Sequence, residues 1–93
     1  MTYQKISGKL VEIDLLADEI KKFPDNLFAS TCLSAEEIKE NYQDSVNYYN
    51  DELKNNETNL DELLKQVDIF LLETKSDLER LKEGKKVLAI GFI

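Results

Sequence analysis

The stretch SAEEIKENYQDSVNYYNDEL, residues 34–53, decides the fold. It opens with a capping box. In this motif the Ser34 side chain can accept a hydrogen bond from a free backbone amide of the first helical turn, and the side chain of Glu37, three residues later, can accept one from the Ser34 backbone N–H. After the box, apolar side chains recur every three or four residues, which is the spacing of one helix face: Ile38, Tyr42, Val46, Tyr49 and Leu53. The stretch therefore predicts an amphipathic helix.

A second helical pattern precedes this stretch, at about residues 4–23. Its apolar side chains also follow three- and four-residue steps: Ile6, Leu10, Ile13, Ala17 and Ile20. Pro24 ends the predicted helix, because its ring nitrogen carries no N–H and it forces the preceding residue out of the helical conformation. Residues 24–33 are then expected to form a connector, in which Leu27 and Phe28 cover one end of the core.

A third helical pattern follows residues 55–59, which are mostly poor helix formers. Thr58 and Asp61 offer a second, weaker capping pattern at its start. The pattern continues as far as Glu83, where Gly84 is a natural C-terminal stop. Its apolar stripe has a near-heptad spacing and consists of Leu60, Leu63, Leu64, Val67, Phe70, Leu71, Thr74, Leu78 and Leu81.

Three predicted helices of similar length favour an all-α fold, a small antiparallel three-helix bundle. The alternative is a helical hairpin with one long second helix, since the apolar stripe almost continues across residues 53–60. We assign residues 1–84 to a single helical domain and residues 85–93 to an apolar C-terminal tail. The tail is open to three interpretations: an extended cover on the bundle, a strand or hook that binds a partner, or the cut start of a membrane helix.

The charge of the chain limits its partners. With 93 residues and a formal net charge of −7, its surface repels nucleic acids and anionic membranes and attracts a basic protein surface. We therefore expect a protein partner and no nucleic acid. The tail is far shorter than the roughly 20 residues that span a bilayer, so these 93 residues should not insert directly into a membrane. The lack of a signal-peptide pattern and the single Cys32 predict a cytoplasmic location.

The residues that most catalytic sites need are missing or isolated. The chain contains no His, so the commonest general base and a common zinc ligand are absent. Cys32 has no imidazole to activate it, and the three glycines match no phosphate-binding loop. We therefore expect no catalytic, cofactor-binding or metal-binding residues, and a protein that is not an enzyme.

An acidic stripe follows the predicted helix of residues 34–53. Residues 34–57 hold two Lys against seven acidic residues. Tyr48 projects from the edge of the stripe, and tyrosine is a common interface anchor. The stripe is a candidate docking surface for a basic partner, and the alternative is an ordinary solvated face. Its acids lie opposite the apolar face of the helix: Glu37, Glu40, Asp44 and Asp51.

Two pairs of apolar residues lie outside the predicted core faces. Val11 and Leu15 point away from the stripe of the first helix, and Ile69 and Leu72 do the same on the third. Paired apolar residues in such positions indicate a second buried surface, in a homo-oligomer or against a protein partner. The alternative is that these helices have a wide buried arc within the bundle.

In size, helicity, acidity and the Tyr48-x-x-x-Glu52 spacing, the chain resembles the small helical partner proteins of type VII secretion. Those proteins usually carry a Trp-x-Gly turn between two helices, whereas this chain has no Trp, so no site residue is carried over. The resemblance implies a role in assembly or secretion. The leading hypothesis from the residues is a non-catalytic protein–protein interaction module, a small acidic helical adaptor or inhibitor. A third alternative is the soluble cytoplasmic domain of a membrane protein.

Overall fold

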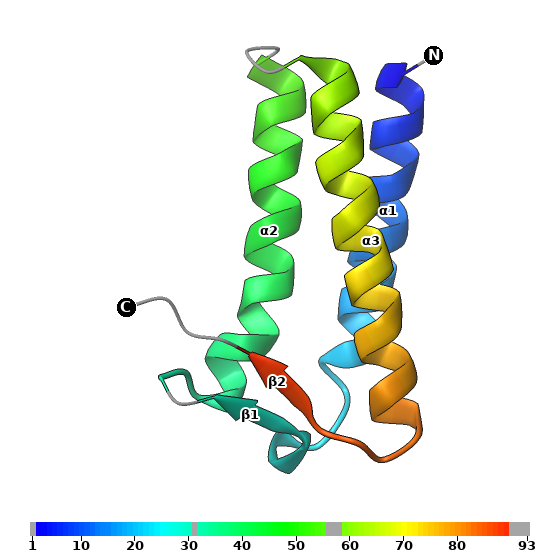
Figure 1. Cartoon of the computed structure of the whole chain (residues 1–93). Coiled ribbons are helices and arrows are strands. Elements are labelled where there is room, and N and C mark those ends of the chain that lie inside the picture. The colour runs from blue at the N-terminus through cyan, green and yellow to red at the C-terminus, as the bar shows by residue number, and fades with distance from the viewer. Residues whose placement is uncertain (1, 31, 56–58, 90–93) are drawn as a thin grey trace.

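Three α-helices form most of the structure, in the order α1 (Thr2–Ile20), α2 (Ala35–Asn55) and α3 (Leu60–Lys82). The computed structural model describes residues 2–30, 32–55 and 59–89. In Figure 1, α2 runs in the opposite direction to α1 and α3, and all three helices contact one another. The prediction of an all-α three-helix arrangement is confirmed. The hairpin alternative is wrong, because α3 returns alongside α2 instead of continuing it.

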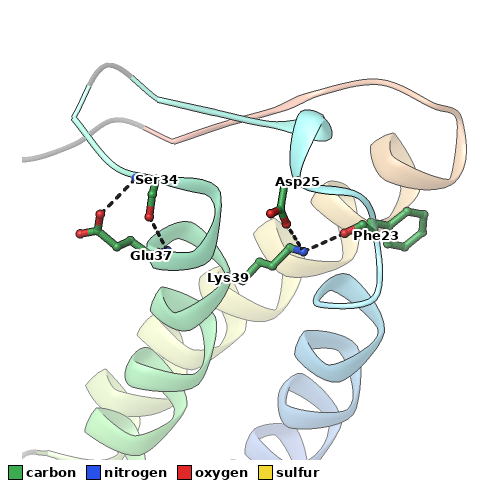
Figure 2. Close-up of polar contacts among 5 residues, drawn as sticks. All are labelled: Phe23, Asp25, Ser34, Glu37 and Lys39. Carbon is green, nitrogen blue, oxygen red and sulfur yellow. Dashed lines mark hydrogen bonds and ion pairs between the residues drawn. The ribbon is translucent and has the colours of Figure 1, made fainter.

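The predicted capping box fixes the start of α2. The Glu37 backbone N–H donates to Ser34 Oγ, and the Ser34 N–H donates to Glu37 Oε1, each at 3.2 Å (Figure 2). Just beyond the box, Lys39 Nζ donates to the Phe23 carbonyl oxygen at 2.8 Å and pairs with Asp25 at 2.7 Å. Through these two contacts, Lys39 links α2 to the segment that follows α1.

Two helix ends differ from the predictions by a few residues. α1 ends at Ile20 rather than near Phe23, and the Phe23 N–H donates to the Ile20 carbonyl oxygen at 3.2 Å in a tighter turn. α3 is capped by Asn59, whose side chain accepts from the Asp61 N–H at 2.9 Å. The predicted cap, Thr58, lies outside the described residues.

Gly84 ends α3 as predicted. Its φ of 78° lies in the left-handed region, which residues with a Cβ rarely adopt. The Gly84 N–H donates to the Leu81 carbonyl oxygen at 3.0 Å, and the Lys85 N–H donates to that of Arg80 at 2.9 Å. These are the two bonds of a Schellman motif, which satisfies the last carbonyl groups of the helix and turns the chain away from the helix axis.

The apolar stripes meet in a core with two adjoining clusters, and Leu16 and Phe70 pack against both. The predicted stripe residue Leu64 is only half-buried. Thr74 is buried, and its hydroxyl donates to the Phe70 carbonyl oxygen at 2.7 Å. The cluster at the upper end in Figure 1 contains Ile6, Leu10, Ile13, Val46, Leu53, Leu63, Val67 and Leu71. The cluster at the lower end contains Ala17, Ile20, Phe28, Ile38, Tyr42, Leu78, Leu81 and Val87.

A small parallel sheet closes the lower end of the bundle, and the sequence patterns did not predict it. The connector forms a short 3-10 helix, η1 (Asp25–Leu27), and then strand β1 (Phe28–Ser30). β1 pairs in parallel with β2 (Val87–Ala89) (Figure 1). In this pairing Phe28 lies opposite Val87. Two segments from opposite parts of the sequence therefore cover the same end of the core.

The described part of the tail, residues 85–89, folds back on the bundle as an extended cover, which was one of the three interpretations. Val87 is 3% exposed and belongs to the same core cluster as Phe28. The Lys86 carbonyl oxygen accepts a hydrogen bond from Arg80 Nη2 at 2.8 Å. The tail residues 90–93 lie outside the described residues. Within the described ranges, none of the helices has the length and apolar character needed to cross a membrane.

Candidate functional site

An open groove runs between α2 and α3. α1 packs closely against both helices, whereas α2 and α3 meet each other at fewer positions. Three adjoining hollows share Ser45 and together form what we call the α2–α3 groove. α2 lines it with Asn41, Asp44, Ser45, Tyr48 and Tyr49, and α3 lines it with Gln66, Ile69, Phe70, Glu73 and Asp77. Its lower end is completed by Ile38, Tyr42 and Val87.

A row of aromatic side chains crosses the groove from α2 to α3. The Tyr48 and Tyr49 rings meet edge to face with their centroids 5.3 Å apart, and the Tyr49 and Phe70 centroids are 5.7 Å apart. Tyr49 and Phe70 are half-buried, whereas Tyr48 is 57% exposed and Ile69, beside Phe70, is 58% exposed. The groove therefore presents an apolar surface that water still reaches.

All the charged side chains that line the groove are acidic. Asp44 stands on the α2 side, and Glu73 and Asp77 stand on the α3 side. Burial raises the pKa of the Tyr49 hydroxyl, and the nearby Tyr48 and Glu73 raise it further. Among residues 2–30, 32–55 and 59–89, no Lys or Arg forms an ion pair with Asp44 or Glu73. The groove thus combines aromatic rings with two carboxylates, Asp44 and Glu73, that pair with no cation of the described chain.

A hydrogen bond links the two helices at the lower end of the groove. The Tyr42 hydroxyl donates to Asp77 Oδ2 at 2.8 Å. Burial, followed by the charge of Asp77, raises the pKa of Tyr42, so the phenol remains protonated. Burial also raises the pKa of Asp77 above its ordinary value of 3.8, although the Tyr42 hydrogen bond and Arg80 act in the opposite direction. Ionisation of the Asp77 carboxyl group therefore lowers the stability of the folded protein.

Asp77→Asn is expected to stabilise the protein near neutral pH and to lose that advantage in acid. The pKa of Asp77 is raised in the folded protein, so the contribution of this carboxyl group to stability is fully present below pH 3.8. It falls as the pH rises through the pKa that Asp77 has in the folded state. An Asn side chain keeps an acceptor for the Tyr42 hydroxyl and does not ionise. Urea unfolding between about pH 3 and about pH 8 measures the difference.

The control for this substitution is Glu79→Gln, which removes one negative charge from an exposed position of the same helix. Removing any acid relieves some repulsion in a chain with a net charge of −7. If the two variants gain the same stability at every pH, burial of Asp77 has no effect of its own and the prediction is wrong.

The structure brings part of the acidic stripe into the groove. Asp44 and Tyr48 line the same hollow on α2. Glu37 is exposed, but its carboxylate accepts the Ser34 N–H in the capping box and so already has a structural role. Glu40 and Asp51 are exposed on α2 and are not among the residues that line the groove.

All four outward-facing apolar residues are exposed. Their exposed fractions are 60% for Val11, 61% for Leu15, 58% for Ile69 and 67% for Leu72. The alternative of a wide buried arc is therefore wrong. Ile69 lines the α2–α3 groove, whereas Val11 lines a separate groove between α1 and α2, and Leu15 and Leu72 line neither.

The sequence patterns missed several residues of the groove. Tyr49 and Phe70 were expected in the core, because each belongs to the apolar stripe of its helix. The adjacent pair Tyr48 and Tyr49 held a signal, since neighbouring residues on a helix point about 100° apart and only one of the two can face the core directly. No comparable pattern indicates Asn41, Ser45, Gln66, Glu73 or Asp77.

Within the described residues, no group of three or more Cys, Asp and Glu side chains is arranged to hold a metal ion. The groups that line the groove are aromatic rings, amide and hydroxyl groups, and carboxylates. The chain matches no family model, no curated protein and no solved structure.

Proposed function

We propose that the protein is a non-catalytic protein–protein interaction module, a small acidic helical adaptor or inhibitor that docks on a basic surface of a protein partner. One observation carries the proposal. Tyr48, Tyr49, Ile69 and Phe70 meet in a single open groove whose charged lining residues are all acidic.

The apolar side chains supply affinity in this proposal. Tyr48 is 57% exposed, which corresponds to about 100 Å² of a large aromatic residue. Burying that area against a partner contributes at most about 2.5 kcal/mol at ~25 cal/mol per Å², before the entropic costs of association are subtracted. An exposed ion pair contributes only about 0–1 kcal/mol. The acids around the groove therefore act mainly on the rate of encounter and on the choice of partner.

The first experiment locates the binding surface. The photocrosslinking amino acid p-benzoylphenylalanine replaces Tyr48 in one variant and Leu15, on the outward face of α1, in a matched variant. Both positions are more than half exposed, so each probe can reach a bound protein. We expect a discrete protein adduct from position 48 and none from position 15. Adducts from position 15 alone would move the binding surface to α1 and overturn the groove.

Kinetics with the purified, crosslinked partner provide the quantitative test. Replacing Glu40 with Gln and Asp44 with Asn in one variant is expected to slow association and to flatten its salt dependence, because rim charges act on encounter. Tyr48→Ala is expected to speed dissociation and to cost about 2 kcal/mol, as for an interface anchor. Binding is measured by surface plasmon resonance at low and high salt. If affinity is unchanged by all three substitutions, the groove and stripe are only a solvated surface.

A further inference from the structure

We infer that the occupant of the α2–α3 groove is an amphipathic helix of the partner, with Lys or Arg on both sides of its apolar stripe, which seats as a fourth helix of the bundle. This inference rests on the proposed function and names the chemistry of the partner at the same site.

The dimensions of the groove suit a helix. Its lining extends along α3 from Gln66 to Asp77, which is roughly 17 Å at 1.5 Å per residue, or about three helical turns. Along α2 it extends from Ile38 to Tyr49. The two walls are neighbouring helices that run in opposite directions, and a third helix can pack its side-chain ridges between them.

Hydrogen bonding favours a helix over an extended segment. Along the groove, the backbone groups of α2 and α3 are hydrogen-bonded within their own helices. An extended peptide needs unpaired backbone groups, such as those at the edge of a strand, and these two helices offer it none. Among the described residues, the uncharged polar side chains other than tyrosine that line the groove are Asn41, Ser45 and Gln66. An occupying helix satisfies its own backbone and needs only apolar contacts with the floor.

Charge favours a basic helix over a second copy of the chain. Asp44 and Glu73 come from opposite walls, so cations on both sides of an apolar stripe would each meet a carboxylate. Two copies placed groove to groove would instead bring these acids together, and each copy has a net charge of −7. Like charges brought together across an interface suppress that pairing.

The probe is a synthetic peptide of Leu and Lys, about 18 residues long, in which Leu recurs at three- and four-residue steps and one Leu is replaced by Trp. The protein contains no Trp, so the fluorescence of this residue reports on the peptide alone. The control peptide has the same composition, but Leu alternates with Lys as in an amphipathic strand. We expect the helical peptide to bind at least about tenfold more tightly than the control.

Two matched variants separate docking in the groove from general attraction between a cationic peptide and an acidic protein. Ile69→Asp and Val11→Asp make the same gain of negative charge at positions of similar exposure, but only Ile69 lines the groove. We expect Ile69→Asp to weaken binding of the helical peptide at least about tenfold, and Val11→Asp to change it less than about twofold.

The outcomes distinguish this inference from the proposed function. If Ile69→Asp binds the helical peptide as tightly as the unmodified protein, charge alone explains binding and the helical occupant is overturned. It is overturned equally if the two peptides bind alike, or if neither binds. In each of these cases the proposed function stands if p-benzoylphenylalanine at position 48 still yields its adduct, and it falls if the adduct is absent.

Discussion

Ile13→Ala should lower the free energy of unfolding by about 2–5 kcal/mol. Ile13 is 0% exposed and lies in the core cluster at the upper end of the bundle. The same cluster contains side chains of both α2 and α3, so a cavity at this position weakens the packing of α1 against two helices at once. A domain of this size is stable by about 5–15 kcal/mol, so the loss is a large fraction of the total.

The matched control for Ile13→Ala is Val11→Ala, two residues earlier on the same helix. Val11 is 60% exposed, and surface substitutions usually change stability by less than about 0.5 kcal/mol. Urea unfolding, followed by circular dichroism at a helical wavelength, gives both values. If the two variants unfold at the same urea concentration, the stripe of α1 does not face the core and the bundle as described is wrong.

The helices could be predicted because their signals are local. The capping box at Ser34 and Glu37 and the left-handed Gly84 act within one or two turns, so adjacent residues determine them. The apolar stripes also indicated the buried faces. They could not distinguish a fully buried side chain such as Leu63 from the half-buried Leu64, because both fall on the stripe and only the packing of neighbouring helices decides between them.

The parallel sheet could not be predicted because its strands have only three residues each and lie far apart in the sequence. Three residues are too few to show an alternating pattern, and the pairing of Phe28 with Val87 depends on how the whole bundle places their segments. The apolar composition of the tail indicated burial. Composition alone could not show whether the tail would be buried against this chain or against a partner.

The candidate site was partly predictable for a similar reason. Asp44 and Tyr48 are one turn apart on a single helix, so helical geometry alone brings them together. Phe70 and Glu73 join them because α2 and α3 approach less closely than the other helix pairs, which leaves the aromatic rings partly uncovered. The distance between two helices depends on the size of all the side chains that fill it, and no periodic pattern specifies that distance.

The tail and the groove are connected through Val87. This residue lines the lower end of the α2–α3 groove beside Tyr42 and Asp77, and it is 3% exposed within the core cluster that contains Phe28. Pairing of β1 with β2 holds it in place. A change that detaches the tail is therefore expected to expose the core and to open the groove at that end.

Val87→Asp should lower the free energy of unfolding by about 3–5 kcal/mol at neutral pH, because it places an uncompensated charge in the core. Val11→Asp is the control, since it makes the same chemical change at a position that is 60% exposed rather than 3%. The loss of stability caused by Val87→Asp should become smaller as the pH falls. Burial raises the pKa of a carboxyl group, and burying its neutral form costs less free energy than burying its charged form. Urea unfolding of both variants at about pH 4 and about pH 7 measures these effects.

If Val87→Asp is as stable as Val11→Asp at neutral pH, the tail does not belong to the core. The lower end of the groove would then be open in the protein itself, and a partner could bind there in place of β2.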